Sequence, residues 1–257
     1  MNAFLLSTGV IAGCMVLLWL LSLRLRDSSI VDLFWGFGFV VIGWVTFAVH
    51  GASLRGWLVS ALVSLWGMRL AIYLTWRNHG RGEDPRYTAM RNRHGAAWSF
   101  RSLFIVFGLQ GALMLFISLP VQFAIGAGGT ELNPLDVVGT VLVLTGVGFE
   151  SIGDLQLARF KANTANKGRV MNVGLWRYTR HPNYFGDAVV WWGFACFGLS
   201  VGAWWTIASA ALMTFLLVRV SGVAMLESAM KNRPGYAEYV ASTSPFIPLP
   251  PRTAQLK

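Results

Sequence analysis

The 257-residue chain is 55% hydrophobic and 12% charged, and its formal net charge is +10. A soluble domain usually has about twice that charged fraction, so the composition excludes an ordinary soluble protein and favours an integral membrane protein. The positive charge does not require nucleic-acid binding, because basic loops are typical of the cytoplasmic face of membrane proteins. We therefore expect lipids, and no nucleic acid, among its partners.

Seven apolar runs have about the length that a bilayer-crossing helix needs, roughly 17–25 residues. The runs cover residues 3–23, 30–50, 56–76, 102–126, 135–158, 185–201 and 203–221. The sixth run is short and nearly merges with the seventh around Gly202, so six spans are the alternative count. Because the runs are continuous rather than alternating, they predict an all-α bundle of seven transmembrane helices, formed by a single membrane domain over residues 1–257.

The distribution of Lys and Arg predicts the orientation of this bundle. Basic residues are concentrated in residues 24–29, 77–101 and 159–183 and in the tail from residue 219. The intervening connections contain only Arg55. By the positive-inside rule, the N-terminus lies outside and the C-terminus lies in the cytoplasm, which requires an odd number of spans.

The cysteines and histidines do not indicate a disulfide or a metal site. Cys14 and Cys196 both lie inside apolar runs, where cysteine behaves as a buried small hydrophobe. The four histidines have no metal-ligand spacing, so we predict no bound metal.

Two positions in the N-terminal half are candidates for proton chemistry. Asp32 lies in the first turns of the second span, where it is either a partner of the helix dipole or a carboxyl group that faces a cavity. A carboxyl group in such a cavity can remain protonated and donate a hydrogen bond to a carbonyl oxygen. Tyr87 follows the charged turn at residues 83–86, which is either a solvated loop or an anion clamp with Tyr87 as a proton donor beside it.

Two acidic residues end the fifth span. Glu150 and Asp154 are four positions apart, which places them on one face of a helix. Two acids at this depth either line a polar cavity or form structural ion pairs with Arg69 or Arg219.

A basic loop follows these acids. Lys161, Lys167 and Arg169 could together seat phosphate groups, Arg through two parallel hydrogen bonds and Lys as a point charge. The chain has neither a G-x-G-x-x-G fingerprint after a strand nor a Walker A motif. A nucleotide would therefore be held by side chains from loops and helix ends.

The stretch from residue 174 to residue 187 has the densest set of polar side chains beside an apolar run. Its sequence is Gly-Leu-Trp-Arg-Tyr-Thr-Arg-His-Pro-Asn-Tyr-Phe-Gly-Asp. It either anchors the protein in lipid headgroups or holds a polar, anionic ligand. Because Asn, His and Asp occur together with Arg, the ligand interpretation is favoured. The tail after residue 230 is predicted to be an amphipathic segment that folds back over this site.

This stretch, preceded by Asp154 and by Lys-Gly-Arg at 167–169 and followed by a Tyr-x-x-Tyr…Pro-Phe-Ile-Pro tail, resembles the steroid 5α-reductase family, in particular its bacterial branch. The resemblance implies a monomeric seven-helix reductase of the bacterial inner membrane, with NADPH on the cytoplasmic side. Residues 135–257 would hold the cofactor, and the helices of residues 1–126 would face the substrate. The substrate would be a 3-oxo-Δ4 steroid or a similar apolar enone that enters from the bilayer and receives hydride at its β-carbon.

The resemblance also implies roles for particular residues. By motif, the residues that would contact NADPH are Asp154, Lys161, Arg169, Asn183, Tyr184 and Asp187. Their expected neighbours in the cofactor site are Arg159, Lys167, Trp176, Arg180, His181 and Glu227. In the family, an acid and a tyrosine bind the ketone oxygen. The second and third spans here lack the Gln-Glu and His-Tyr pairs of the animal enzymes, so Asp32, Tyr87 and Glu150 become the catalytic candidates.

Two other functions are compatible with the sequence. A membrane methyltransferase of the isoprenylcysteine or phospholipid type, using S-adenosylmethionine, also carries an Arg-His-Pro-x-Tyr stretch, but usually with paired glutamates where this chain has Glu227-Ser228. A lipid-binding or transport protein would have polar residues along a pathway at the midplane. The polar residues here cluster on the predicted cytoplasmic side, which favours the enzymes.

Overall fold

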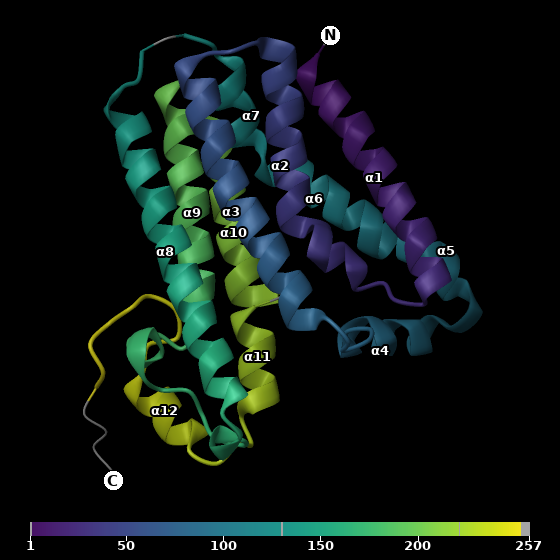
Figure 1. Ribbon diagram of the computed structural model, residues 1–257, viewed down its shortest axis with the longest axis vertical. Helices are drawn as coiled ribbons and strands as arrows, with labels where there is room; N and C mark the ends of the chain where they lie inside the picture. The colour runs from purple at the N-terminus through teal and green to yellow at the C-terminus, as the bar shows by residue number, and fades with distance from the viewer. Residues whose placement is uncertain (1, 130, 221, 253–257) are drawn as a thin grey trace. The chain divides into compact units, whose positions relative to one another are not determined.

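The computed structural model describes residues 2–129, 131–220 and 222–252 (Figure 1). Within these residues all regular structure is helical, and the β-type pairing they contain is an isolated parallel bridge between Thr179 and Ser244. The all-α prediction is confirmed. The chain divides into two compact units. We call them the N-terminal unit (Met1–Val137 and Cys196–Ser209) and the C-terminal unit (Val138–Ala195 and Ala210–Lys257).

Several helices are long and apolar enough to cross a membrane, as an integral membrane protein requires. In the described part of the chain there are 6 such stretches: Ala3–Leu25, Ile30–His50, Leu54–Asn78, Pro85–Ile117, Pro134–Ala162 and Trp204–Ser228. The predicted span at residues 185–201 corresponds to helix α9 (Pro182–Ser200), which is not one of these six. A total of seven spans, and the predicted orientation, therefore stay predictions.

The N-terminal unit begins with three long helices. These are α1 (Ala3–Leu25), α2 (Ile30–His50) and α3 (Leu54–Asn78). A Cβ atom on Gly36 of α2 would lie 2.5 Å from the carbonyl oxygen of Gly67 on α3, so the two backbones are in contact at this crossing. Close approach at glycine is a common way for apolar helices to pack in membranes.

The predicted fourth span is not one continuous α-helix. It consists of α4 (Pro85–His94), α5 (Trp98–Ser102), a π-helical segment (Leu103–Gly108), α6 (Leu109–Ile117) and α7 (Leu119–Gly126). The break between α6 and α7 precedes Pro120, which has no backbone N–H and cannot continue the hydrogen-bond ladder of α6. The carbonyl oxygen of Phe116 instead accepts a 2.8 Å hydrogen bond from the hydroxyl of buried Ser209.

An ion pair buried from solvent holds one end of the N-terminal unit together. The guanidinium of Arg55 donates to both carboxylate oxygens of Asp136, each at 3.0 Å, and also to the carbonyl oxygens of Gly128 and Glu131. Asp136 is 0% exposed and accepts a further 2.7 Å hydrogen bond from the hydroxyl of Ser200. The pair therefore ties the start of α3 to the start of α8 and to the loop before it.

The C-terminal unit is built on two long helices that run side by side (Figure 1). They are α8 (Pro134–Ala162) and α9, and they are followed by α10 (Ile207–Phe215), a π-helical segment (Leu216–Val220), α11 (Val223–Met230) and α12 (Tyr236–Ser242). A Cβ atom on Gly146 of α8 would lie 2.5 Å from the carbonyl oxygen of Gly186, and one on Gly193 of α9 would lie 2.8 Å from that of Gly139. Glycines seven positions apart therefore form the α8–α9 contact.

We expect Gly146→Ala to destabilise the protein by about 1–3 kcal/mol, because the new methyl group would collide with the backbone of α9. Gly148→Ala is the matched control, since a Cβ atom there meets nothing within 4 Å. The control should be neutral, or more stable by up to ~1 kcal/mol from helix propensity. Thermal unfolding in detergent compares the two, and equal Tm values would contradict the close contact of α8 with α9.

Candidate functional site

The polar stretch at residues 174–187 forms a loop that is bound tightly to α8. Gly174 has a φ of +63°, and a Cβ atom there would lie 2.5 Å from the amide nitrogen of Gln156, so glycine is required on both counts. The carbonyl oxygen of the Gln156 side chain accepts a 3.0 Å hydrogen bond from the backbone N–H of Leu175. The indole N–H of Trp176 donates to the carbonyl oxygen of Gly153 at 3.0 Å.

The C-terminal tail covers the other side of this loop, as predicted. The hydroxyl of Thr179 donates to the carbonyl oxygen of Phe246 at 2.8 Å, and the phenol of Tyr239 donates to that of Trp176 at 2.5 Å. The backbone N–H of Arg180 donates to the carbonyl oxygen of Ser244 at 2.9 Å. The loop is thus enclosed between α8 and the tail, and it is part of a folded site rather than a free headgroup anchor.

Arg180 joins three segments at the start of α9. Its guanidinium forms an ion pair with Glu227 of α11 at 2.7 Å and donates to the carbonyl oxygen of Thr243, just after α12, at 2.7 Å. The side chain is 8% exposed. An arginine with this many structural partners positions α11 and the tail around the loop.

His181 lies next to this ion pair at the first turn of α9. Its Nε2 is 3.3 Å from Oε1 of Glu227, and its ring is stacked on that of Tyr184, with centroids 5.6 Å apart. Burial lowers the pKa of His181, and the repulsion from Arg180 acts in the same direction, while the hydrogen bond and the charge of Glu227 oppose them. The imidazole is therefore neutral at physiological pH.

A cavity of about 530 Å³ opens beside this loop. Its cationic wall contains Lys161, Lys167, Arg169, Arg180 and Arg233. Its aromatic and apolar wall includes Phe160, Met171, Trp176, Leu226, Met230, Tyr236 and Tyr239. Burial raises the pKa values of Tyr236 and Tyr239, so these phenols stay neutral. The volume lies in the range of about 300–1,000 Å³ that is usual for small-molecule sites.

Half of the predicted cofactor residues line the cavity. They are Lys161, Lys167, Arg169, Trp176, Arg180 and His181. Glu227 and Tyr184 contact His181 from behind, and Asn183 donates a 3.1 Å hydrogen bond to Asp154 across the α8–α9 contact. Asp187 is buried on α9, whereas Arg159 is exposed on α8.

Three lining residues were not predicted as site residues. Arg233, Tyr236 and Tyr239 come from the tail. The Tyr-x-x-Tyr spacing was the available signal, because residues three apart share one face of a helix such as α12. The spacing alone did not say which surface this face would meet.

Glu150 and Asp154 lie on one face of α8, as predicted. They are 2% and 5% exposed, and a Cβ atom on Gly186 of α9 would lie 2.9 Å from Cγ of Glu150. Glu150 belongs to the C-terminal unit, while Asp32 and Tyr87 belong to the N-terminal unit.

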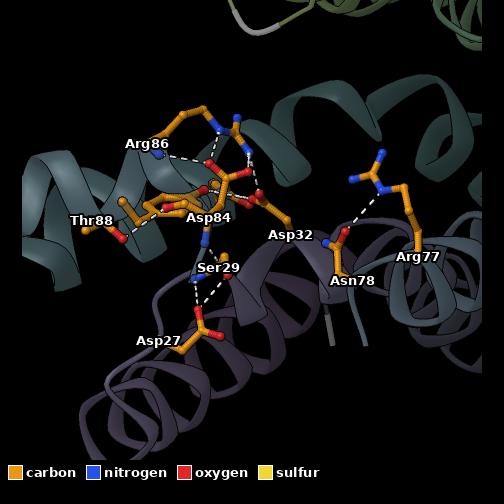
Figure 2. Close-up of polar contacts among 10 residues, drawn as sticks. Asp27, Ser29, Asp32, Arg77, Asn78, Asp84, Arg86 and Thr88 are labelled. Carbon is orange, nitrogen blue, oxygen red and sulfur yellow. Dashed lines mark hydrogen bonds and ion pairs between the residues drawn. The ribbon is translucent and has the colours of Figure 1, made fainter. Parts of the chain in front are cut away.

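Asp32 and Tyr87 are hydrogen-bonded to each other in the N-terminal unit. The phenol of Tyr87 donates to Oδ1 of Asp32 at 2.7 Å. Gln110 of α6 donates from Nε2 to the same carboxylate oxygen at 3.2 Å and to the Tyr87 oxygen at 3.1 Å. The guanidinium of Arg86 donates to Oδ2 of Asp32 at 2.8 Å (Figure 2). Asp32 is therefore an acceptor for three side chains, and Tyr87 is the proton-bearing member of the pair.

The charged turn before Tyr87 is fastened to the start of α2. Asp84 accepts hydrogen bonds from the backbone N–H and the guanidinium of Arg86, each at 2.9 Å, and caps α4 (Figure 2). Glu83 accepts from the backbone N–H of Ser28 at 2.8 Å and from Arg91 at 2.7 Å. Burial alone would raise the pKa of Glu83, but these hydrogen bonds and the charge of Arg91 outweigh it, and the pKa is lowered. The turn is thus ordered and places Tyr87 against Asp32.

Residues 18–243 match a protein family described as "Protein of unknown function (DUF1295)". The chain belongs to the DUF1295 family. The matched range contains both the Asp32–Tyr87–Gln110 cluster and the cavity residues of the C-terminal unit. Comparison of this DUF1295 protein with curated proteins and with solved structures gave no match.

Proposed function

We propose that this DUF1295 protein is a membrane-embedded, NADPH-dependent reductase of the C4=C5 double bond in 3-oxo-Δ4 steroids or similar enone lipids. The observation that carries the proposal is the cavity of about 530 Å³, which combines a cationic wall with an aromatic one. The resemblance of residues 174–187 to steroid 5α-reductases supports the same reaction, and this loop forms part of the cavity wall through Trp176, Arg180 and His181. Seven spans and a cytoplasmic cofactor site belong to the proposal.

The cavity residues fit NADPH. Lys161, Lys167 and Arg169 line it together and can neutralise phosphate groups, with the guanidinium able to bind one bidentately. The rings of Trp176 and Tyr236 offer flat surfaces to a planar base, and buried Nδ1 of His181 has no partner within the described structure. When bound, NADPH supplies the hydride that adds to the β-carbon of the enone.

The Asp32–Tyr87–Gln110 cluster is suited to the carbonyl end of the substrate. Hydride addition breaks the C=C π bond and places negative charge on the ketone oxygen as an enolate, which takes up a proton at the α-carbon to give the saturated ketone. A fixed donor at that oxygen stabilises the developing charge. Tyr87 carries the proton, and its contacts with Asp32 and Gln110 fix the position of its hydroxyl.

A methyltransferase that uses S-adenosylmethionine is the second candidate. It is favoured by the contact of Arg180 and His181 with Glu227, because this places the Arg-His-Pro stretch beside a C-terminal acid. Thermal shifts with NADPH, NADH and S-adenosylmethionine separate the two functions. A ligand that binds the folded protein at 100 times its Kd adds about 2.7 kcal/mol of stability. A shift with S-adenosylmethionine and none with NADPH would favour the methyltransferase.

We expect Arg169→Ala to weaken NADPH binding about 10- to 100-fold, the effect of losing a charged hydrogen bond to a phosphate. The effect on NADH should be much smaller, because NADH lacks the 2′-phosphate. Arg177→Ala is the matched control, since Arg177 is an exposed arginine of the neighbouring loop that does not line the cavity. Titration of each variant with both cofactors measures the Kd values. Equal losses for NADPH and NADH would contradict a 2′-phosphate contact.

A further inference from the structure

His181 carries a buried ring nitrogen whose bonding is incomplete. The residue is 4% exposed and lines the cavity of the C-terminal unit. Its Nδ1 has no hydrogen-bond partner within the described residues. Buried polar atoms are normally satisfied, and an orphaned atom at a cavity wall is one that a ligand can satisfy.

The contact with Glu227 determines what this nitrogen can do. Nε2 faces Oε1 of Glu227 at 3.3 Å, and a carboxylate oxygen that already accepts from Arg180 must also accept here. The proton of a neutral imidazole therefore sits on Nε2, which leaves a lone pair on Nδ1. The tautomer follows from the hydrogen-bond partner, and it makes Nδ1 an acceptor.

The surroundings keep the ring neutral. Burial and the guanidinium of Arg180 both lower the pKa of His181, and Glu227 opposes them. The ring also lies at the N-terminus of the 19-residue helix α9, where the helix dipole disfavours a cation. The stacked ring of Tyr184 covers one face of the imidazole. Nδ1 thus remains an acceptor at physiological pH.

We propose that His181 is a specificity-determining residue whose Nδ1 accepts a hydrogen bond from an N–H or O–H group of the molecule bound in the cavity. It selects for a ligand donor, such as an amide, amino or hydroxyl group, and not for a phosphate. The identity of the ligand rests on the proposed function, since NADPH offers all three kinds of donor. Protonation of His181 would turn the acceptor into a donor and weaken binding.

A matched pair of variants separates the two nitrogens. In His181→Asn the side-chain amide reaches the position of Nδ1, whereas in His181→Gln it reaches that of Nε2. We expect His181→Gln to weaken the binding of NADP⁺ about 5- to 150-fold, the range for leaving a buried group unsatisfied. His181→Asn should bind several-fold more tightly than His181→Gln. If His181→Asn loses as much affinity as His181→Gln or more, the ring acts through Glu227 and the inference is overturned.

Dependence on pH provides a second measurement that a purely structural role would not change. NADP⁺ is used because it is stable in acid, and the ratio of the wild-type to the His181→Gln affinity cancels the titration of the phosphates and of Glu227. The pKa of His181 is lowered, so its acceptor form predominates at about pH 7.5 and is lost as the pH falls through the folded-state pKa. The wild-type advantage should therefore shrink toward about pH 5. An advantage that grows in acid would show a cation binding an anion, which overturns the inference.

The two proposals fail in different ways. A wild-type protein that does not bind NADP⁺ overturns the proposed function. The same three proteins are then titrated with S-adenosylmethionine, which also presents amino and hydroxyl donors, and the Asn–Gln comparison decides the role of His181. A wild-type protein that binds neither molecule overturns both proposals.

Discussion

Arg55→Met is expected to lower stability by about 3–5 kcal/mol, the cost of leaving a buried charge without its partner. Asp136 is 0% exposed and accepts both of its charged hydrogen bonds from Arg55 at 3.0 Å. The hydroxyl of Ser200 and the backbone N–H of Asn133 would remain as neutral donors. They cannot replace a guanidinium, which also satisfies two loop carbonyl oxygens.

Thermal unfolding in detergent tests this expectation against Arg24→Met, which removes an exposed arginine of α1 and should change little. The double variant Arg55→Met/Asp136→Leu should recover much of the lost stability, because removing both partners also removes the unpaired charge. An Arg55→Met protein as stable as Arg24→Met would contradict the buried clamp.

The helices of this protein could be predicted better than the contacts between them. Long apolar runs gave α1, α2, α3 and α8 to within a few residues, because a helix is the way that such a run satisfies its backbone in a membrane. The break before Pro120 was hidden by the apolar composition around it, although proline alone was a reason to expect one. Arg55 was identified only as a loop charge, since its partner lies 81 residues away and no local pattern joins them.

The candidate sites show the same division. The chemical need for an acid beside a phenol brought Asp32 and Tyr87 together across 55 residues, and the structure bonds them. Gln110 was noted as a lone polar residue and given no role, because a single amide in an apolar run has no period or spacing to interpret. Arg233 was counted only as a tail charge for the same reason, yet it lines the cavity.

For the proposed reductase, Tyr87→Phe should reduce kcat on a 3-oxo-Δ4 steroid about 10²- to 10³-fold, or roughly 2.7–4 kcal/mol, the usual effect of removing one donor to a developing oxyanion. The phenyl ring keeps the packing of a residue that is 7% exposed, so the loss should come from the hydroxyl alone. NADPH affinity should change little, because the cationic cavity belongs to residues of the other unit. Tyr73→Phe, which removes a phenol of α3 outside this cluster, is the matched control.

Variants of the partners locate the proton more closely. Asp32 accepts from Tyr87, Gln110 and Arg86, so its expected role is to hold the phenol in place rather than to donate. Asp32→Asn keeps an acceptor oxygen and should retain more activity than Asp32→Leu, while Gln110→Leu should cost less than Tyr87→Phe because it leaves the phenol bonded to Asp32. If Tyr87→Phe reduces the steroid at the normal rate and Glu150→Gln does not, the donor is the buried carboxyl of α8. The polar cluster of the N-terminal unit would then be structural, and its charged turn would serve to anchor α4 on α2.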